Sequence, residues 1–194
     1  MTALGPFDGQ HQPEGDIRHQ ADQYMVVAAE IAQVLTRINQ SSYTTFKQDL
    51  ADKSRSWFFT GQGRSGLVAA MAAMRLMHIG RQSHVVGEPT CPAIRRGDGI
   101  VLLSGSGQTL TTVSFANLAG LAGARVLALT AEPDSPLARA ANTVLAIPVG
   151  QSNQIGRNLF EQAALIVLDA LIGDLASELD DAAALLAERH TNLQ

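Results

Sequence analysis

Two glycine-rich turns constrain this chain more than any other feature of its sequence. The first spans residues 61–66 and reads Gly-Gln-Gly-Arg-Ser-Gly, and the second spans residues 104–109 and reads Ser-Gly-Ser-Gly-Gln-Thr. Each follows a short apolar run and precedes a helix-forming stretch, so each is expected to join a buried strand to a helix. In a parallel sheet such turns gather at the carboxyl ends of the strands, so both should face one crevice. Because helix N-termini offer unpaired N–H groups, that crevice would suit a small phosphorylated molecule.

Strands and helices alternate through the middle of the chain. Apolar runs predict strands near residues 56–60, 83–87, 99–104, 125–130 and 143–147, and helical periodicity predicts helices near 64–79, 109–122 and 135–141. Such alternation is typical of a parallel sheet with helices on both faces, because parallel strands need crossover connections. The sequence therefore predicts an α/β fold with a doubly wound, five-stranded parallel sheet.

Further helices flank this α/β unit. Apolar periodicity predicts helices over residues 17–38 and 45–53 before it, and over 159–175 and 177–189 after it. The 159–175 segment is apolar on almost every side, which favours burial by another subunit and hence a homo-oligomer. The glycine- and proline-rich residues 1–15 are interpreted as a mobile leader, and residues 16–194 as a single domain.

Composition argues against several classes of function. A formal net charge of −4 and an aromatic content of 5% give neither a basic surface nor a stacking platform for nucleic acid. The N-terminal residues are too polar for a signal peptide, and the uncharged stretch 99–124 is too rich in Ser, Thr and Gly to span a membrane. We therefore expect no nucleic-acid partner, no membrane association and a cytoplasmic location. Cys91 is the only cysteine, so it is either a reactive thiol or, as we favour, a small, partly buried residue.

The first turn admits more than one interpretation. Gly61, Gly63 and Gly66 match the G-x-G-x-x-G fingerprint of dinucleotide-binding domains, and Glu88 follows the next strand, where a ribose-binding carboxylate is sought. Against a nicotinamide site stand the hydroxyl groups of the second turn, for which such a site has no need. A third interpretation is tight strand–helix packing with ordinary N-caps, and the presence of two such turns argues against it.

Several short segments accompany the two turns. They are residues 74–80 (MRLMHIG), 86–90 (VGEPT), 92–94 (PAI), 159–162 (LFEQ) and 189–194 (RHTNLQ). With the turns, they resemble the sugar isomerase (SIS) domain family and, more narrowly, the 6-phospho-3-hexuloisomerases, from residue 25 to the C-terminus. The second turn is shared by SIS domains in general, whereas its combination with MRLMHIG, LFEQ and RHTNL is specific to the hexuloisomerase group.

Three features depart from the family pattern. Gln108 stands where the family has Glu, residues 149–157 form a short connection of different sequence, and the polar leader is additional. The first two leave the details of the substrate open. None of the three removes an expected catalytic residue.

The resemblance implies an SIS-type fold and a ketose isomerase that interconverts 3-hexulose 6-phosphate and fructose 6-phosphate, in formaldehyde assimilation or pentose phosphate supply. It implies no metal and no organic cofactor, a sugar phosphate as the small-molecule partner, and a homo-oligomer, usually a tetramer. The expected substrate-binding residues are Arg64, Ser65, Ser104, Gly105, Ser106, Gly107, Gln108 and Thr109.

Glu161 and His190 are the expected catalytic residues. Isomerisation through an enediolate needs a base, and Glu161 lies near the start of an otherwise apolar helix. From the sequence alone it could equally interact with the helix dipole, and the resemblance favours catalysis. His190 lies in a polar tail, and we expect it to reach the crevice of a neighbouring subunit and transfer protons there.

The remaining candidates are favoured as structural residues. His78 is interpreted as a core histidine, His84 as structural or exposed, and Arg75 as a buried partner of a carboxylate. His78 and Glu88 stay as alternative bases. Two other functions remain open, a non-catalytic SIS module that binds a sugar phosphate and another SIS phosphosugar isomerase.

Overall fold

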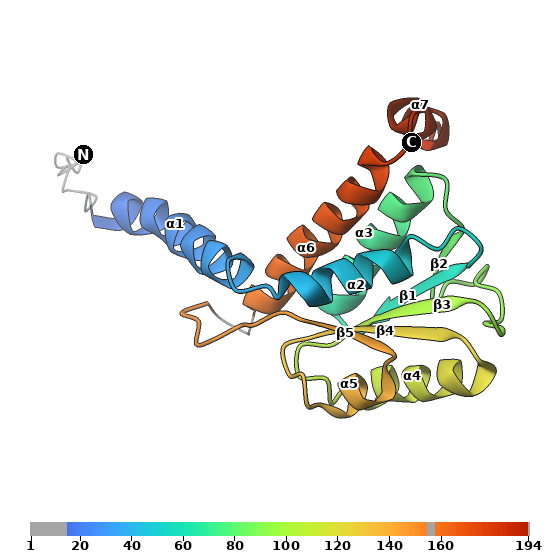
Figure 1. The fold of residues 1–194 in the computed structure, drawn as a ribbon. Coiled ribbons are helices and arrows are strands. Elements are labelled where there is room, and N and C mark those ends of the chain that lie inside the picture. Colours follow the sequence, from blue (N-terminus) through green and yellow to red (C-terminus); the bar gives the residue numbers. More distant parts are fainter. Residues whose placement is uncertain (1–14, 155–157, 194) are drawn as a thin grey trace, which may run out of the picture.

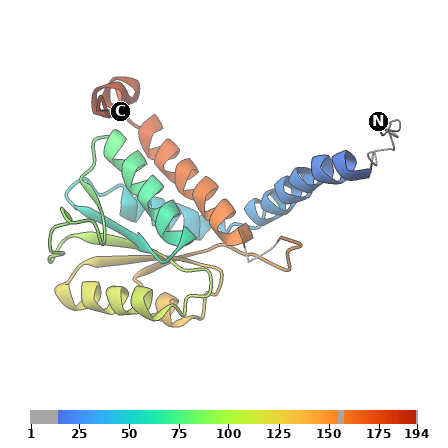
Figure 2. The same cartoon turned by 180° about the vertical axis from the view of Figure 1, so that it is seen from behind.

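The computed structural model describes residues 15–154 and 158–193. The expected leader, residues 1–15, lies outside the described residues except for Gly15, which begins α1 (Gly15–Leu35). Figure 1 shows an α/β body from which the N-terminal part of α1 projects, and the view from behind in Figure 2 agrees. Among the described residues, no helix is both long enough and apolar enough to cross a membrane.

The body is built on a parallel sheet with the strand order β2-β1-β3-β4-β5. The strands are β1 (Trp57–Gly61), β2 (Ser83–Val85), β3 (Gly99–Leu103), β4 (Arg125–Thr130) and β5 (Thr143–Ala146). Gly99 lies beside Trp57 in the register, and a Cβ on Gly99 would collide with the Trp57 ring. The predicted doubly wound α/β fold is confirmed, and β2 ends two residues before the predicted boundary at residue 87.

Helices cover both faces of the sheet. The helices α2 (Gln40–Leu50), α3 (Arg64–His78) and α6 (Asn158–Ser177) lie on one face, and α4 (Leu110–Ala122) and α5 (Pro136–Ala140) lie on the other (Figure 1). Alternate residues of the central strands enter the two layers of core. In β3, for example, Val101 packs on the α3 and α6 side and Leu102 on the α4 side. This two-sided burial explains why the strands appear as continuous apolar runs in the sequence.

Several predicted helix boundaries are wrong, and α1 and α2 each end three residues before the predicted residues 38 and 53. α2 begins at Gln40 instead of residue 45, because Asn39 caps it by accepting a hydrogen bond from the Ser42 amide at 2.9 Å. The last helix, α7 (Ala182–Arg189), begins later than residue 177, because α6 continues to Ser177. The predicted spans of α3, α4 and α5 agree with the structure to within one or two residues.

The apolar residues of α6 are buried, but by helices of the same chain and not by the second subunit that the sequence led us to expect. Its apolar residues pack mostly against α1, α2 and α3 of the same chain, so no second subunit is needed to bury them. The outward side of α6 carries Asp169, Gly173 and Asp174 next to the half-exposed Ile166. The prediction that this helix is apolar almost all round is therefore wrong, and α6 alone gives no evidence for an oligomer.

Candidate active site

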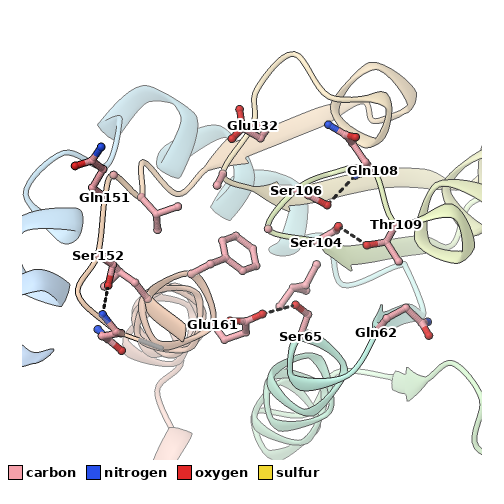
Figure 3. Close-up of a pocket in the computed structure, with 18 residues that line it drawn as sticks. Gln62, Ser65, Ser104, Ser106, Gln108, Thr109, Glu132, Gln151, Ser152 and Glu161 are labelled. Carbon is pink, nitrogen blue, oxygen red and sulfur yellow. Dashed lines mark hydrogen bonds between the residues drawn. The ribbon is translucent and has the colours of Figure 1, made fainter. Parts of the chain in front are cut away.

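A pocket of about 790 Å³ lies at the carboxyl ends of β1, β3 and β4, beside the first turn of α6. Its lining residues come from both glycine-rich turns, from the segment after β5 and from α6. They are Gln62, Ser65, Leu103, Ser104, Gly105, Ser106, Gln108, Thr109, Ala131, Glu132, Val149, Gly150, Gln151, Ser152, Gln154, Leu159, Phe160 and Glu161. Figure 3 shows their polar side chains around one cavity. The predicted shared crevice is confirmed.

The second turn presents hydroxyl and amide groups to the pocket. The Ser104 and Thr109 hydroxyl oxygens lie 3.1 Å apart, and the Gln108 amide donates to the Ser106 hydroxyl at 3.2 Å. Thr109 caps α4 without a side-chain hydrogen bond to that helix. The positive end of the α4 dipole therefore lies at a turn rich in donors, an arrangement suited to an anion such as a phosphate.

Glycines allow this turn to sit close to its neighbours. Gly107 has a φ of +60°, and a Cβ there would collide with Ser135 and Thr130. A Cβ on Gly105 would lie 3.2 Å from the Phe160 ring of α6. The turn is thus packed between the loop after β4 on one side and α6 on the other.

The first turn holds a carboxylate. The Ser65 hydroxyl, at the start of α3, donates to Glu161 Oε1 at 3.1 Å, and Arg64 Nη2 pairs with Glu161 Oε2 at 3.2 Å. Arg64 also donates to Asn158 Oδ1, in the same turn of α6 as Glu161. Ser65 is buried, whereas the Glu161 side chain keeps 20% exposure on the pocket side. A carboxylate fixed by two donors at the wall of a polar pocket can serve as a base.

Not every predicted site residue lines the pocket. Gly107 shapes the second turn through its backbone, and Arg64 lies behind Glu161 as its ionic partner. His190 lies at the opposite end of α3, where its ring stacks on His78 with 5.5 Å between ring centres. At the helical rise of 1.5 Å per residue, His78 is roughly 20 Å along α3 from Ser65. Within one chain, His190 is therefore not brought to Glu161.

The other candidates behave mostly as structural residues. His78 is buried, and burial first, then the neighbouring His190 and Arg75, lowers its pKa. Arg75 pairs with Asp169 at 3.7 Å, as predicted, but its side chain is 44% exposed, so the prediction that it is buried is wrong. His84 is half-buried against the ring of Phe58.

Glu88 and Cys91 lie in the loop after β2, away from the pocket lining. Glu88 is exposed there, so nothing in its position supports the role of alternative base. Burial, followed by the nearby Glu88 carboxylate, raises the pKa of the Cys91 thiol. A raised thiol pKa disfavours the reactive thiolate, which supports the interpretation of Cys91 as a partly buried structural residue.

Several lining residues escaped the sequence reasoning. Glu132 lies just after β4, and the rule that turns gather at the carboxyl edge could have found it. Gln151, Ser152 and Gln154 belong to the connection after β5, in which no local pattern indicates a site. Phe160 looked like one more apolar residue of its helix. Among the described residues, no group of three or more His, Cys, Asp or Glu side chains is arranged to hold a metal ion.

Comparison with known proteins assigns the chain to a family. The SIS domain model matches residues 49–172. The 3-hexulose-6-phosphate isomerase of Mycobacterium gastri is 38% identical over the full length of both chains. That of Bacillus subtilis is 32% identical, over 84% of this chain and 97% of its own. The G-x-G-x-x-G match at the first turn is thus part of an SIS domain.

Comparison with a solved structure supports the same assignment at the level of the fold. The crystal structure of a Methanococcus jannaschii protein, for which a molecular function of 3-hexulose-6-phosphate isomerase was inferred, has a TM-score of 0.80. It is 28% identical, and the match covers 89% of this chain and 99% of that one. The chain belongs to the SIS domain family, in the group that contains the 3-hexulose-6-phosphate isomerases.

Proposed function

We propose that this protein is an isomerase that interconverts 3-hexulose 6-phosphate and fructose 6-phosphate. The observation that carries the proposal is the Glu161 carboxylate, held by Ser65 in a pocket that the hydroxyl-rich turn 104–109 also lines. A base and an anion site in one cavity are what this reaction requires. Full-length similarity to a 3-hexulose-6-phosphate isomerase supports the same substrate.

The proposed reaction moves the carbonyl group from C3 to C2. The phosphate binds at the second turn, to Ser104, Ser106 and Thr109 and to nearby amides. Glu161 removes the proton from C2, and the electron pair forms the C2–C3 double bond of an enediolate. The proton is then returned to C3, while the proton of the C2 hydroxyl is transferred to the C3 oxygen, which leaves a carbonyl group at C2 and a hydroxyl group at C3. Donors around the pocket stabilise the enediolate oxygens, and the step needs no external oxidant or reductant.

A homo-oligomer, in the form of a tetramer, is the second part of the proposal. Leu67, Met71 and Met74 follow one another at helical spacing on the outer side of α3 and keep 67%, 43% and 48% exposure. An apolar stripe of this kind is typical of a protein–protein contact. Within its own chain His190 is far from Glu161, so we propose that it reaches the pocket of a neighbouring subunit. The cytoplasmic location, and the role in formaldehyde assimilation or pentose phosphate supply, stay predictions.

The activity is tested by a coupled assay. Purified protein is supplied with 3-hexulose 6-phosphate made in situ, and fructose 6-phosphate is detected by its onward conversion. Turnover supports the proposal. Tight binding of fructose 6-phosphate without turnover would contradict it and would favour a non-catalytic sugar-phosphate-binding module instead.

The shared site has its own test. Inactive Glu161→Gln subunits are mixed with inactive His190→Ala subunits under conditions that exchange subunits. If Glu161 and His190 meet across an interface, some mixed assemblies contain an intact pair and activity partly returns. Mixed assemblies of confirmed composition that remain inactive would contradict a shared site.

A further inference from the structure

The carboxylate of Glu30, on α1, binds the segment that follows β5. Glu30 Oε2 accepts from the Ser152 hydroxyl at 2.6 Å and from the Gln154 side-chain amide at 3.0 Å. Glu30 Oε1 accepts from the backbone amide of Asn153 at 2.9 Å. One side chain thus satisfies three donors in three successive residues, from a helix that lies 122 to 124 residues earlier in the chain.

Apart from Ile147 and Val149, which pack on the core, this segment has little else to hold it. Residues 147–154 form no helix or strand, and the backbone amide of Gln154 donates only locally, to the Ser152 hydroxyl at 3.0 Å. Within the part of the chain that the structure describes, every side-chain hydrogen bond from residues 152–154 to another element ends on Glu30. The Ser152 hydroxyl first, then the Asn153 amide and the Gln154 side chain, lower the pKa of Glu30, so the carboxylate stays ionised at neutral pH.

The same segment is a wall of the pocket. Gln151, Ser152 and Gln154 line the cavity, and Figure 3 shows Gln151 and Ser152 across it from Thr109 and Gln62. A sugar phosphate anchored by its phosphate at the second turn would extend its carbon chain away from that turn. Its hydroxyl groups would then meet the amide and hydroxyl side chains of this wall.

We propose that Glu30 is a positioning residue for sugar-phosphate binding, which fixes residues 152–154 as the wall that faces the sugar hydroxyls. The inference rests on the proposed function and assigns a role in it to α1, which does not line the pocket. Because this wall is already ordered before the ligand binds, the free energy of binding does not include the entropy cost of ordering residues 152–154. Loss of Glu30 should therefore weaken binding of the sugar part while leaving the phosphate site and Glu161 in place.

The test compares Glu30→Ala, Glu30→Gln and the control Glu178→Ala. Glu178 also accepts a side-chain hydrogen bond between elements, from Lys47 at 3.0 Å, but it lies outside the pocket lining. For Glu30→Ala we expect KM and the calorimetric Kd for fructose 6-phosphate to rise about tenfold, as for lost preorganisation. We expect kcat, and inhibition by inorganic phosphate, to change less than about twofold, since neither depends on this wall.

Glu30→Gln should rescue part of the loss, because its amide oxygen can still accept from the Asn153 amide. Glu178→Ala should leave KM and Kd unchanged. A lower Tm for Glu30→Ala with unchanged KM and Kd would overturn the inference, and so would an equal loss in Glu178→Ala. A change in assembly mass that accompanies the loss would also overturn it.

The proposed function can fail separately. A wild-type protein that binds fructose 6-phosphate without turnover would contradict the isomerase, while the calorimetric comparison would still decide the role of Glu30. A wild type that binds no fructose 6-phosphate would overturn both.

Discussion

The two glycine-rich turns are alike in sequence and differ in what they do. In the first turn, a Cβ on Gly66 would lie 2.7 Å from the Gly61 carbonyl oxygen, so the backbone there is closed tightly on itself. This turn directs Ser65 and Arg64 at the carboxylate of Glu161. The second turn instead directs hydroxyls into an open cavity (Figure 3). The first turn thus holds an anionic side chain, whereas the second is the turn that we propose receives the phosphate.

The difference follows from what each turn faces. α6 begins next to α3, so the Ser65 hydroxyl and the Arg64 guanidinium of the first turn meet a carboxylate of the protein itself. The second turn begins α4 on the far side of the sheet, where the pocket separates it from Glu161. A strand-to-helix turn can therefore receive a ligand only where the fold leaves space in front of it.

Replacing Glu161 by Gln should have the largest effect, because it removes the base and keeps the size of the side chain. We expect kcat to fall at least about a hundredfold, the usual contribution of a general base. Calorimetry should show that fructose 6-phosphate still binds, because the second turn is intact. Retained turnover would show that the base is elsewhere and that the first turn holds only a structural carboxylate.

Ser104→Ala and Thr109→Val should act on binding instead. Losing a hydrogen bond to a charged group costs about 1.5–3 kcal/mol, so KM should rise roughly ten- to a hundredfold with the fold intact. Ser41→Ala, on α2 and outside the pocket lining, is the control that should leave KM unchanged. If neither variant alters KM, the second turn is not the phosphate site, and the contrast between the two turns is lost.

The packing at Gly61 in the first turn and at Gly105 in the second can be compared by adding one methyl group to each. A Cβ on Gly61 would lie 2.7 Å from the backbone carbon of Ser65, whereas the nearest atoms to one on Gly105 belong to the Phe160 side chain, at 3.2 Å. We expect Gly61→Ala to lower the free energy of unfolding by about 1–3 kcal/mol, as overpacking does, and Gly105→Ala to lower it less. Gly120→Ala, with no atom within 4 Å of the added Cβ, is the control. If Gly61→Ala and Gly105→Ala lower the free energy of unfolding in urea equally, the difference in packing between these two positions is contradicted.

The smallest effect should be on the pH dependence of stability, at the other end of α3, where His78 is buried beneath His190. Burial lowers the pKa of His78 below its ordinary value of 6.5, so the unfolded chain takes up the proton first as the pH falls. The stabilisation from the neutral ring is complete above pH 6.5 and is lost as the pH falls through the folded pKa. The free energy of unfolding, measured with urea, should therefore be lower at pH 5.5 than at pH 8. His78→Gln should make this difference smaller, and the control His84→Gln should leave it unchanged. An unchanged decrease in His78→Gln would contradict this origin.

The strands, and the turns that follow β1 and β3, are determined by the sequence alone. Apolar runs of strand length, Gly and Ser at their ends and helical periodicity after them are local signals, and each acts within a few residues. They predicted five strands, the two turns, and the meeting of Ser65 with Ser104 at one crevice, because parallel strands end at one edge. The start of α2 shows the limit of such signals, because the capping residue Asn39 places it at Gln40, more than one helical turn before the predicted residue 45.

Only the tertiary structure decided which side chains meet across the fold. The Ser65 hydroxyl donates to a carboxylate 96 residues away, and Ser152 donates to Glu30 at a separation of 122. No local pattern encodes such pairs, because they depend on how α1, α3 and α6 pack. The same packing covers the apolar side of α6 within one chain and keeps His190 at the far end of α3. Periodicity states which residues a helix must bury, and the packed structure alone decides what buries them.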